Sequence, residues 1–230
     1  MCGTAKLLLG FAIAFAVFIL GPPLLGQPFP PYTSIHWADV FDIFTPLVLI
    51  PLYWLLFTNS GGIRRSKGQN IFFLLLAGLW VEGQAMHLAA NSIGNLLGSG
   101  GTDVHHLIHF YDEVLSHYFW HIAIVGLSVL LLVLSDPPKN KPTRWPLIIP
   151  AGVLYGITCF LAFTEGATVP FSFPAVALTL LGLLLWKRKF IRIDNLVAFF
   201  FLGYLVSVVL FTAWGLYWGG FPEFTEVGLL

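Results

Sequence analysis

The chain has 230 residues, and its eleven Lys and Arg residues balance eleven Asp and Glu residues, so the formal net charge is zero. Hydrophobic residues make up 57% and charged residues only 10%, whereas soluble domains carry roughly 25% charged residues. This composition excludes a water-soluble globule and a long disordered tail. The missing basic excess also argues against nucleic-acid binding. A multi-pass protein of the lipid bilayer fits these numbers.

Seven apolar runs follow one another along the chain, each close to the ~20 residues that a helix needs to cross a bilayer. They cover residues 7–25, 40–57, 71–93, 116–134, 146–163, 171–186 and 196–218. Because backbone polar groups must be satisfied internally in lipid, each run is predicted to be a helix. We therefore expect an all-α fold, with one domain over residues 1–230 and seven transmembrane helices. The first run also has features of a secretory signal, but no A-x-A cleavage pattern follows it.

The basic residues predict the orientation. In a seven-span arrangement all eleven fall on one side of the membrane: Lys6, Arg64, Arg65, Lys67, Lys139, Lys141, Arg144, Lys187, Arg188, Lys189 and Arg192. By the positive-inside rule this side is cytoplasmic. The N-terminus is then expected inside and the C-terminal residues 221–230 outside, in a plasma membrane or an inner membrane.

The histidines all fall toward the opposite, non-cytoplasmic side. They are His36, His87, His105, His106, His109, His117 and His121. The positive-inside rule sorts Lys and Arg and does not account for this placement, so it calls for another explanation.

A stripe of metal-ligand residue types runs through the segment between the third and fourth spans. His105, His109, Glu113, His117 and His121 recur every four residues, so neighbours share one face of a helix. His87 is expected at the depth of His117 and His121 on the adjacent antiparallel helix. The pattern predicts a divalent metal, zinc first and iron second, held by these three histidines. Glu113 or Asp112 would complete the ligand set, orient a ligating imidazole or act as general base.

Further polar residues are expected to line the same pocket or to support its ligands. Gln84 and Asn91 share a helical face with His87, and Glu82 stands near the middle of the third span, where we expect a buried carboxylate that is protonated or paired. The full set of pocket candidates is Glu82, Gln84, Asn91, Ser92, His105, His109, Tyr111 and Glu165. For Glu82 a structural hydrogen bond is an equal alternative to a role in proton transfer.

These residues favour an intramembrane metal-dependent hydrolase that acts on a lipid or another apolar substrate from the non-cytoplasmic side. In span number and general chemistry this picture resembles the seven-span metal hydrolases of the alkaline ceramidase and adiponectin-receptor-like superfamily. That family carries its paired histidines in the last span, where this sequence has none. His105-His106-x-x-His109 followed by His117-x-x-x-His121 is also similar to the histidine boxes of membrane di-iron hydroxylases and desaturases, which normally face the cytoplasm.

Two other classes stay open. A proton- or metal-coupled transporter would use Glu82 and the histidine stripe, although no titratable residue lines the cytoplasmic half of any predicted span. A non-catalytic membrane subunit would bind haem, a pigment or a partner through histidine, which needs only one or two residues. The sequence specifies neither the substrate nor the oligomeric state.

Overall fold

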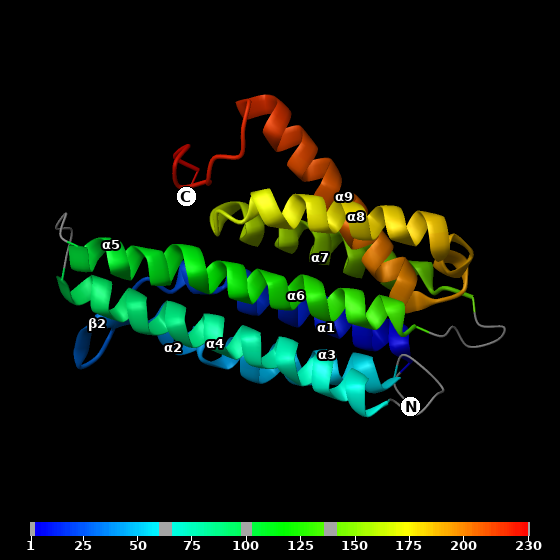
Figure 1. Cartoon of the computed structure of the whole chain (residues 1–230), viewed down its shortest axis with the longest axis horizontal. Coiled ribbons are helices and arrows are strands. Elements are labelled where there is room, and N and C mark those ends of the chain that lie inside the picture. Colours follow the sequence, from blue (N-terminus) through cyan, green and yellow to red (C-terminus); the bar gives the residue numbers. More distant parts are fainter. Residues whose placement is uncertain (1–2, 60–65, 98–102, 136–141, 230) are drawn as a thin grey trace.

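The computed structural model describes residues 3–59, 66–97, 103–135 and 142–229, and most of them form helices that run along one long axis (Figure 1). The elements are α1 (Thr4–Leu20), η1 (Pro22–Leu24), β1 (Pro28–Phe29), β2 (Tyr32–His36), α2 (Trp37–Asp42), α3 (Phe44–Asn59), α4 (Lys67–Leu97), α5 (Asp103–His109), η2 (Phe110–Leu115), α6 (Ser116–Val133), α7 (Trp145–Glu165), α8 (Val169–Trp186), η3 (Arg188–Arg192) and α9 (Asn195–Trp218). Strands β1 and β2 pair as a short antiparallel hairpin.

Within the described residues, six helical stretches are long and apolar enough to cross a membrane. They are Trp37–Asn59, Lys67–Leu97, Asp103–Val133, Trp145–Glu165, Val169–Trp186 and Asn195–Trp218. The chain is therefore an all-α integral membrane protein with several spans. Helix α1 is a further apolar helix but has only 17 residues, so the count of seven spans stays a prediction.

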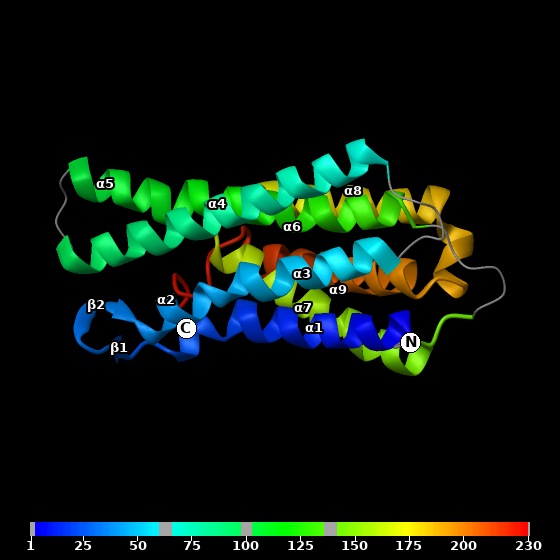
Figure 2. The same cartoon turned by 90° about the horizontal axis from the view of Figure 1, so that it is seen from below.

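The helices overlap all seven predicted runs but differ from them at several ends. The third and fourth runs belong to longer helices, because α4 continues to Leu97 and the helical stretch that includes α6 begins at Asp103. These extensions lie side by side and project at one end of the bundle (Figures 1 and 2). The first helix ends earlier than predicted, at Leu20, because Pro22 and Pro23 follow and proline cannot donate a backbone hydrogen bond.

The described basic residues gather at one end of the bundle, which we call the basic end. They are Lys6, Lys67, Arg144, Lys187, Arg188, Lys189 and Arg192, while Arg64, Arg65, Lys139 and Lys141 lie outside the described residues. The Lys187 ammonium donates to the Ser135 carbonyl at 3.0 Å, and the backbone N–H of Arg144 donates to the Asn195 side chain at 2.8 Å. The seven histidines lie on β2, on the second half of α4, on α5 and on the first part of α6, toward the opposite end, which we call the histidine end (Figure 1). The predicted separation of the two residue types therefore holds in the described part of the chain.

A close helix contact positions the histidine end. A Cβ atom on Gly83 would lie 2.7 Å from the Ser116 carbonyl oxygen and 3.0 Å from the Trp120 nitrogen. Only glycine therefore allows α4 and α6 to approach this closely, which is how small residues act at helix interfaces in membranes. One turn further along α4, this approach brings His87 against the start of α6.

The segment η2 interrupts the α-helix between α5 and α6. It is a π-helical turn, and the Ser116 N–H bonds to the Tyr111 carbonyl, five residues back. Such a turn contains an extra residue, which rotates the side chains on either side of it relative to each other by about 100°. The predicted stripe is therefore helical throughout, but it does not keep a single α-helical register.

Candidate functional site

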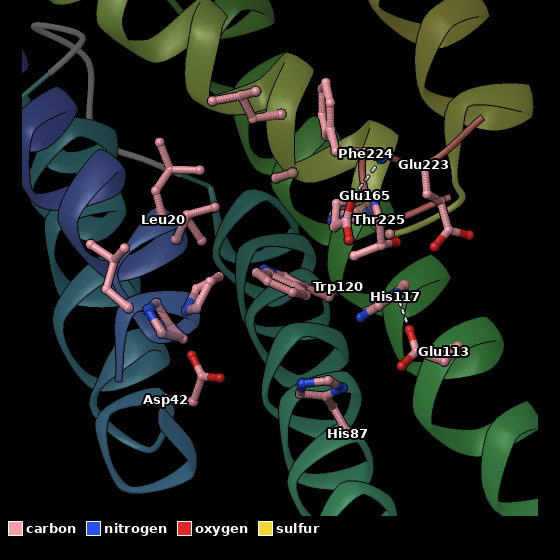
Figure 3. A pocket seen from close by; sticks show the side chains of 18 of the residues that line it. Leu20, Asp42, His87, Glu113, His117, Trp120, Glu165, Glu223, Phe224 and Thr225 are labelled. Carbon is pink, nitrogen blue, oxygen red and sulfur yellow. Dashed lines mark hydrogen bonds and ion pairs between the residues drawn. The ribbon is translucent and has the colours of Figure 1, made fainter. Parts of the chain in front are cut away.

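A cavity of about 640 Å³ opens at the histidine end, between the ends of α1, α2, α4, α6 and α7 and the C-terminal segment (Figure 3). Three histidines line it: His87, His117 and His121. Four carboxylates line it as well: Asp42, Glu113, Glu165 and Glu223. The structure thus brings together the three predicted metal ligands, which come from two different helices, in one cavity.

His87 is held in place by Asp112 of the π-helical segment. The Asp112 carboxylate lies 2.7 Å from Nδ1 of His87, and both side chains are largely buried. The His87 ring centroid lies 5.2 Å from that of His117. Because Nδ1 is engaged by Asp112, Nε2 is the His87 atom that remains to meet a ligand.

His117 and His121 stand one turn apart on α6, with ring centroids 5.9 Å apart and ring planes 26° from parallel. Glu113 lies one turn before His117, and its carboxylate is 3.8 Å from Nδ1 of that histidine. A Cβ atom on Gly166 would lie 2.7 Å from His121 Cε1 and 3.2 Å from His117 Nδ1. The two rings therefore fill the space that only a glycine leaves free at the end of α7.

His121 is 1% exposed, and one nitrogen of its ring contacts a threonine at the start of α8. Its Nδ1 lies 2.7 Å from the Thr168 hydroxyl, and that hydroxyl donates its only proton to the Phe163 carbonyl at 3.3 Å. In the tautomer that fits both contacts, Nδ1–H of His121 donates to Thr168 and Nε2 is an acceptor. Among the described residues this buried Nε2 has no hydrogen-bond partner.

The C-terminal segment folds back and forms one wall of the cavity. The chain reverses after α9 at Gly219, whose φ of 67° lies in the left-handed region that favours glycine. Phe224 then packs on Trp214, with ring centroids 4.7 Å apart. One carboxylate oxygen of Glu165 accepts from the Phe224 N–H at 2.9 Å and from the Thr225 N–H at 3.4 Å (Figure 3).

The donor set suits a metal ion, but the side chains as they stand do not form a complete site. Within the described residues, no three His, Cys, Asp or Glu side chains are arranged to hold a metal ion. The unpartnered Nε2 of His121 is the kind of atom that ligates a metal, and Nδ1 of His87 is oriented by a carboxylate as in many metal sites. The side chain of Glu113 is 48% exposed, and its carboxylate lies 3.8 Å from Nδ1 of His117.

Several predicted pocket residues lie outside this cavity. His105, His109 and Asn91 line a second, more open hollow of about 470 Å³, which shares Glu113 with the main cavity. Asn91 donates to Asp39 at 2.7 Å and so ties α4 to α2.

Three other pocket candidates line neither hollow: Gln84, Ser92 and Tyr111. Among the residues described, Gln84 is 2% exposed and its side-chain amide has no hydrogen-bond partner.

The expectation that Glu82 is buried is wrong. Glu82 is exposed on the outer face of α4, because the next two residues, Gly83 and Gln84, occupy the side that packs against the bundle. Glu82 does not line the cavity. Glu165, in contrast, does line it, as predicted from its position at the end of the fifth apolar run.

Sequence reasoning missed three contributors to the cavity. Asp42 is buried there and accepts from the Thr45 hydroxyl at 3.3 Å. Its spacing from Asp39, i and i+3, was a signal, but the pair resembles solvated residues at a membrane interface. Glu223 and Trp120 gave no comparable signal, because their approach to the histidines depends on the chain reversal and on helix rotation.

Comparison with models of protein families, with curated proteins and with solved structures finds no match to this chain. The fold defines the class as a multi-pass helical membrane protein, and the case for a function rests on the cavity.

Proposed function

We propose that this protein is a membrane-embedded hydrolase that cleaves a lipid or another apolar substrate, assisted by a divalent metal, zinc first and iron second. The observation that carries the proposal is the meeting of His87, His117 and His121 with Glu113 in one cavity at the histidine end. By the positive-inside rule this end faces the non-cytoplasmic side. Ionisable groups inside membrane helices are costly, so they are functional candidates by default.

The histidines would hold the metal, and the residues behind them would orient the rings. Asp112 fixes His87 through Nδ1, and Thr168 fixes His121 through Nδ1. Both contacts leave an Nε2 atom for a ligand, which is the usual arrangement in histidine metal sites. A bound divalent metal would supply a water of lowered pKa as nucleophile.

Glu113 is the best candidate for the general base. Its carboxylate is partly exposed, lines the cavity and stands beside His117. A base in this position can take a proton from an attacking water. Trp120 lines the same cavity, and its indole N–H is buried without a hydrogen-bond partner in the described part of the chain. This donor suits the carbonyl oxygen of an ester or amide substrate.

Elemental analysis of the detergent-purified protein tests the proposal. We expect close to one zinc or iron per chain in the wild type and loss of this metal in the His117→Ala/His121→Ala variant. The matched control is His105→Ala/His109→Ala, which removes two histidines at the same spacing from the second hollow and should keep the metal. A wild-type protein that takes up no metal, even after incubation with zinc, would overturn the metal-dependent mechanism. A haem absorption band would instead support a histidine-ligated subunit.

A further inference from the structure

Beside its three histidines, the cavity is lined by more carboxylates than any other charged group. Among the described residues, its charged lining apart from histidine consists of Asp42, Glu113, Glu165 and Glu223, without a Lys or Arg. The described Lys and Arg residues lie at the basic end of the bundle. Arg144 at the start of α7 is about 31 Å from Glu165 at its other end, at 1.5 Å per residue.

Other carboxylates act electrostatically on Glu223, which lines the cavity. Partial burial raises the pKa of Glu223, and the neighbouring carboxylates Glu226, Glu165 and Glu113 raise it further. Neighbouring like charges disfavour ionisation. A cation placed among them would relieve the repulsion, whereas an anion would increase it.

The polar lining of the cavity includes hydrogen-bond acceptors beside the indole N–H donor of Trp120. The bare Nε2 of His121 is a buried acceptor without a partner in the described residues, and ionised carboxylates only accept. The indole ring of Trp120 lines the same space, and aromatic faces attract cations. A ligand that offers N–H donors and a positive charge matches this lining.

The other side of the cavity is apolar. Leu20, Leu24, Leu161 and Leu229 line it, and its volume of about 640 Å³ lies within the roughly 300–1,000 Å³ range of small-ligand sites. We propose that the cavity binds an amphiphile with a cationic, hydrogen-bond-donating head, in chemical class a long-chain amine. This inference rests on the proposed function in taking the cavity as the substrate site.

The inference is tested with three probes that share a twelve-carbon alkyl chain and differ in the head group: dodecylamine, dodecan-1-ol and dodecanoic acid. The full chain is placed in phosphatidylcholine nanodiscs, treated with chelator, and titrated with each radiolabelled probe, and binding to empty nanodiscs is subtracted. We expect dodecylamine to bind at least about tenfold more tightly than dodecanoic acid, with dodecan-1-ol between them. High salt should weaken only the binding of dodecylamine.

A pair of charge-matched variants locates the effect. Glu113→Gln/Glu223→Gln removes two cavity carboxylates and should weaken dodecylamine binding about tenfold while leaving dodecan-1-ol unchanged. Glu82→Gln/Asp103→Asn removes two carboxylates that do not line the cavity, and it should bind all three probes as the wild type does. Thermal unfolding of each variant verifies that it is folded before binding is compared.

Three results would overturn the inference: equal binding of the amine and the acid, no specific binding of the amine, or the same loss of amine binding in both double variants. These results are separate from the proposed function, because the protein is free of metal in this assay and no turnover is measured. A protein without metal or hydrolytic activity could still bind the amine, and a metal-dependent hydrolase could still reject it.

Discussion

The carboxylate of Asp112 lies 2.7 Å from Nδ1 of His87, although the two residues come from different helices. The contact joins the π-helical segment η2 to α4. It fixes both the orientation of the imidazole and the nitrogen that it presents to the cavity.

Asp112→Asn is expected to lower zinc affinity by about 10–100-fold, the usual cost of losing a carboxylate behind a ligating histidine. The asparagine can still accept from His87 but lacks the charge that strengthens the imidazole as a ligand. Competition with a chromophoric chelator measures the affinity. Asp103→Asn is the control, because Asp103 is exposed at the start of α5. Unchanged affinity in Asp112→Asn would remove His87 from the ligand set.

Gly166→Ala is expected to destabilise the protein by about 1–3 kcal/mol through overpacking. The added Cβ would lie 2.7 Å from His121 Cε1, so the ring must move and the contact with Thr168 must change. Gly78→Ala is the matched control, since its Cβ would meet nothing within 4 Å on the outer face of α4. That control should be neutral or stabilising by up to ~1 kcal/mol. Chemical unfolding in detergent compares the two, and equal effects would contradict the packing described for Gly166.

Glu165→Ala is expected to release the C-terminal wall of the cavity. The Glu165 carboxylate accepts from the Phe224 and Thr225 N–H groups, and hydrogen bonds to charged groups contribute about 1.5–3 kcal/mol. Amide hydrogen exchange at these two positions should therefore become about 10–100-fold faster. Glu82→Gln should leave this exchange unchanged. Slow exchange in Glu165→Ala would mean that the packing of Phe224 on Trp214 alone holds the segment.

Glu223 predicts a pH dependence of stability. Burial and nearby carboxylates raise the pKa of folded Glu223 above its usual 4.5, so the folded state holds this proton more tightly than the unfolded state. The contribution of Glu223 to stability therefore falls as the pH rises from about 4.5 through the raised pKa. Glu223→Gln should match the wild type near pH 4 and have a higher Tm at pH 7. The difference is best measured at low salt, because Glu223 is only partly buried. A higher Tm of the variant at pH 4 alone would reverse the sign and refute the argument.

Hydropathy and charge predicted that the apolar runs form helices and which end of the bundle carries the basic residues, because the bilayer imposes both helix length and the sorting of Lys and Arg. Several helices begin or end elsewhere than predicted. The grouping of His87 with His117 and His121 was also predicted, since antiparallel neighbours at equal depth must lie close. These features depend on position along the membrane normal, which a single sequence records.

Two features were not predictable in the same way: which side of a helix faces the bundle, and which segments distant in the sequence come into contact. Glu82 and Gln84 are two residues apart and equally polar, yet Glu82 is exposed and Gln84 is buried. The packing of Gly83 against α6 decides this, and hydropathy does not record it. The fold-back that brings Glu223 to the cavity depends on Gly219 and on contacts with Glu165, which is 58 positions earlier in the chain and carries no pairing signal in one sequence.

The π-helical segment makes the candidate site sensitive to the phase of one helix. A substitution within Phe110–Leu115 changes one side chain, whereas deleting a single residue there would restore a regular α-helix. The part of the helix that carries Asp112 would then turn by about 100° relative to His117 and His121. The most informative mutation in this protein is therefore the deletion of one residue within the π-helical segment. It replaces no candidate ligand, yet it moves the Asp112 carboxylate away from the His87 imidazole.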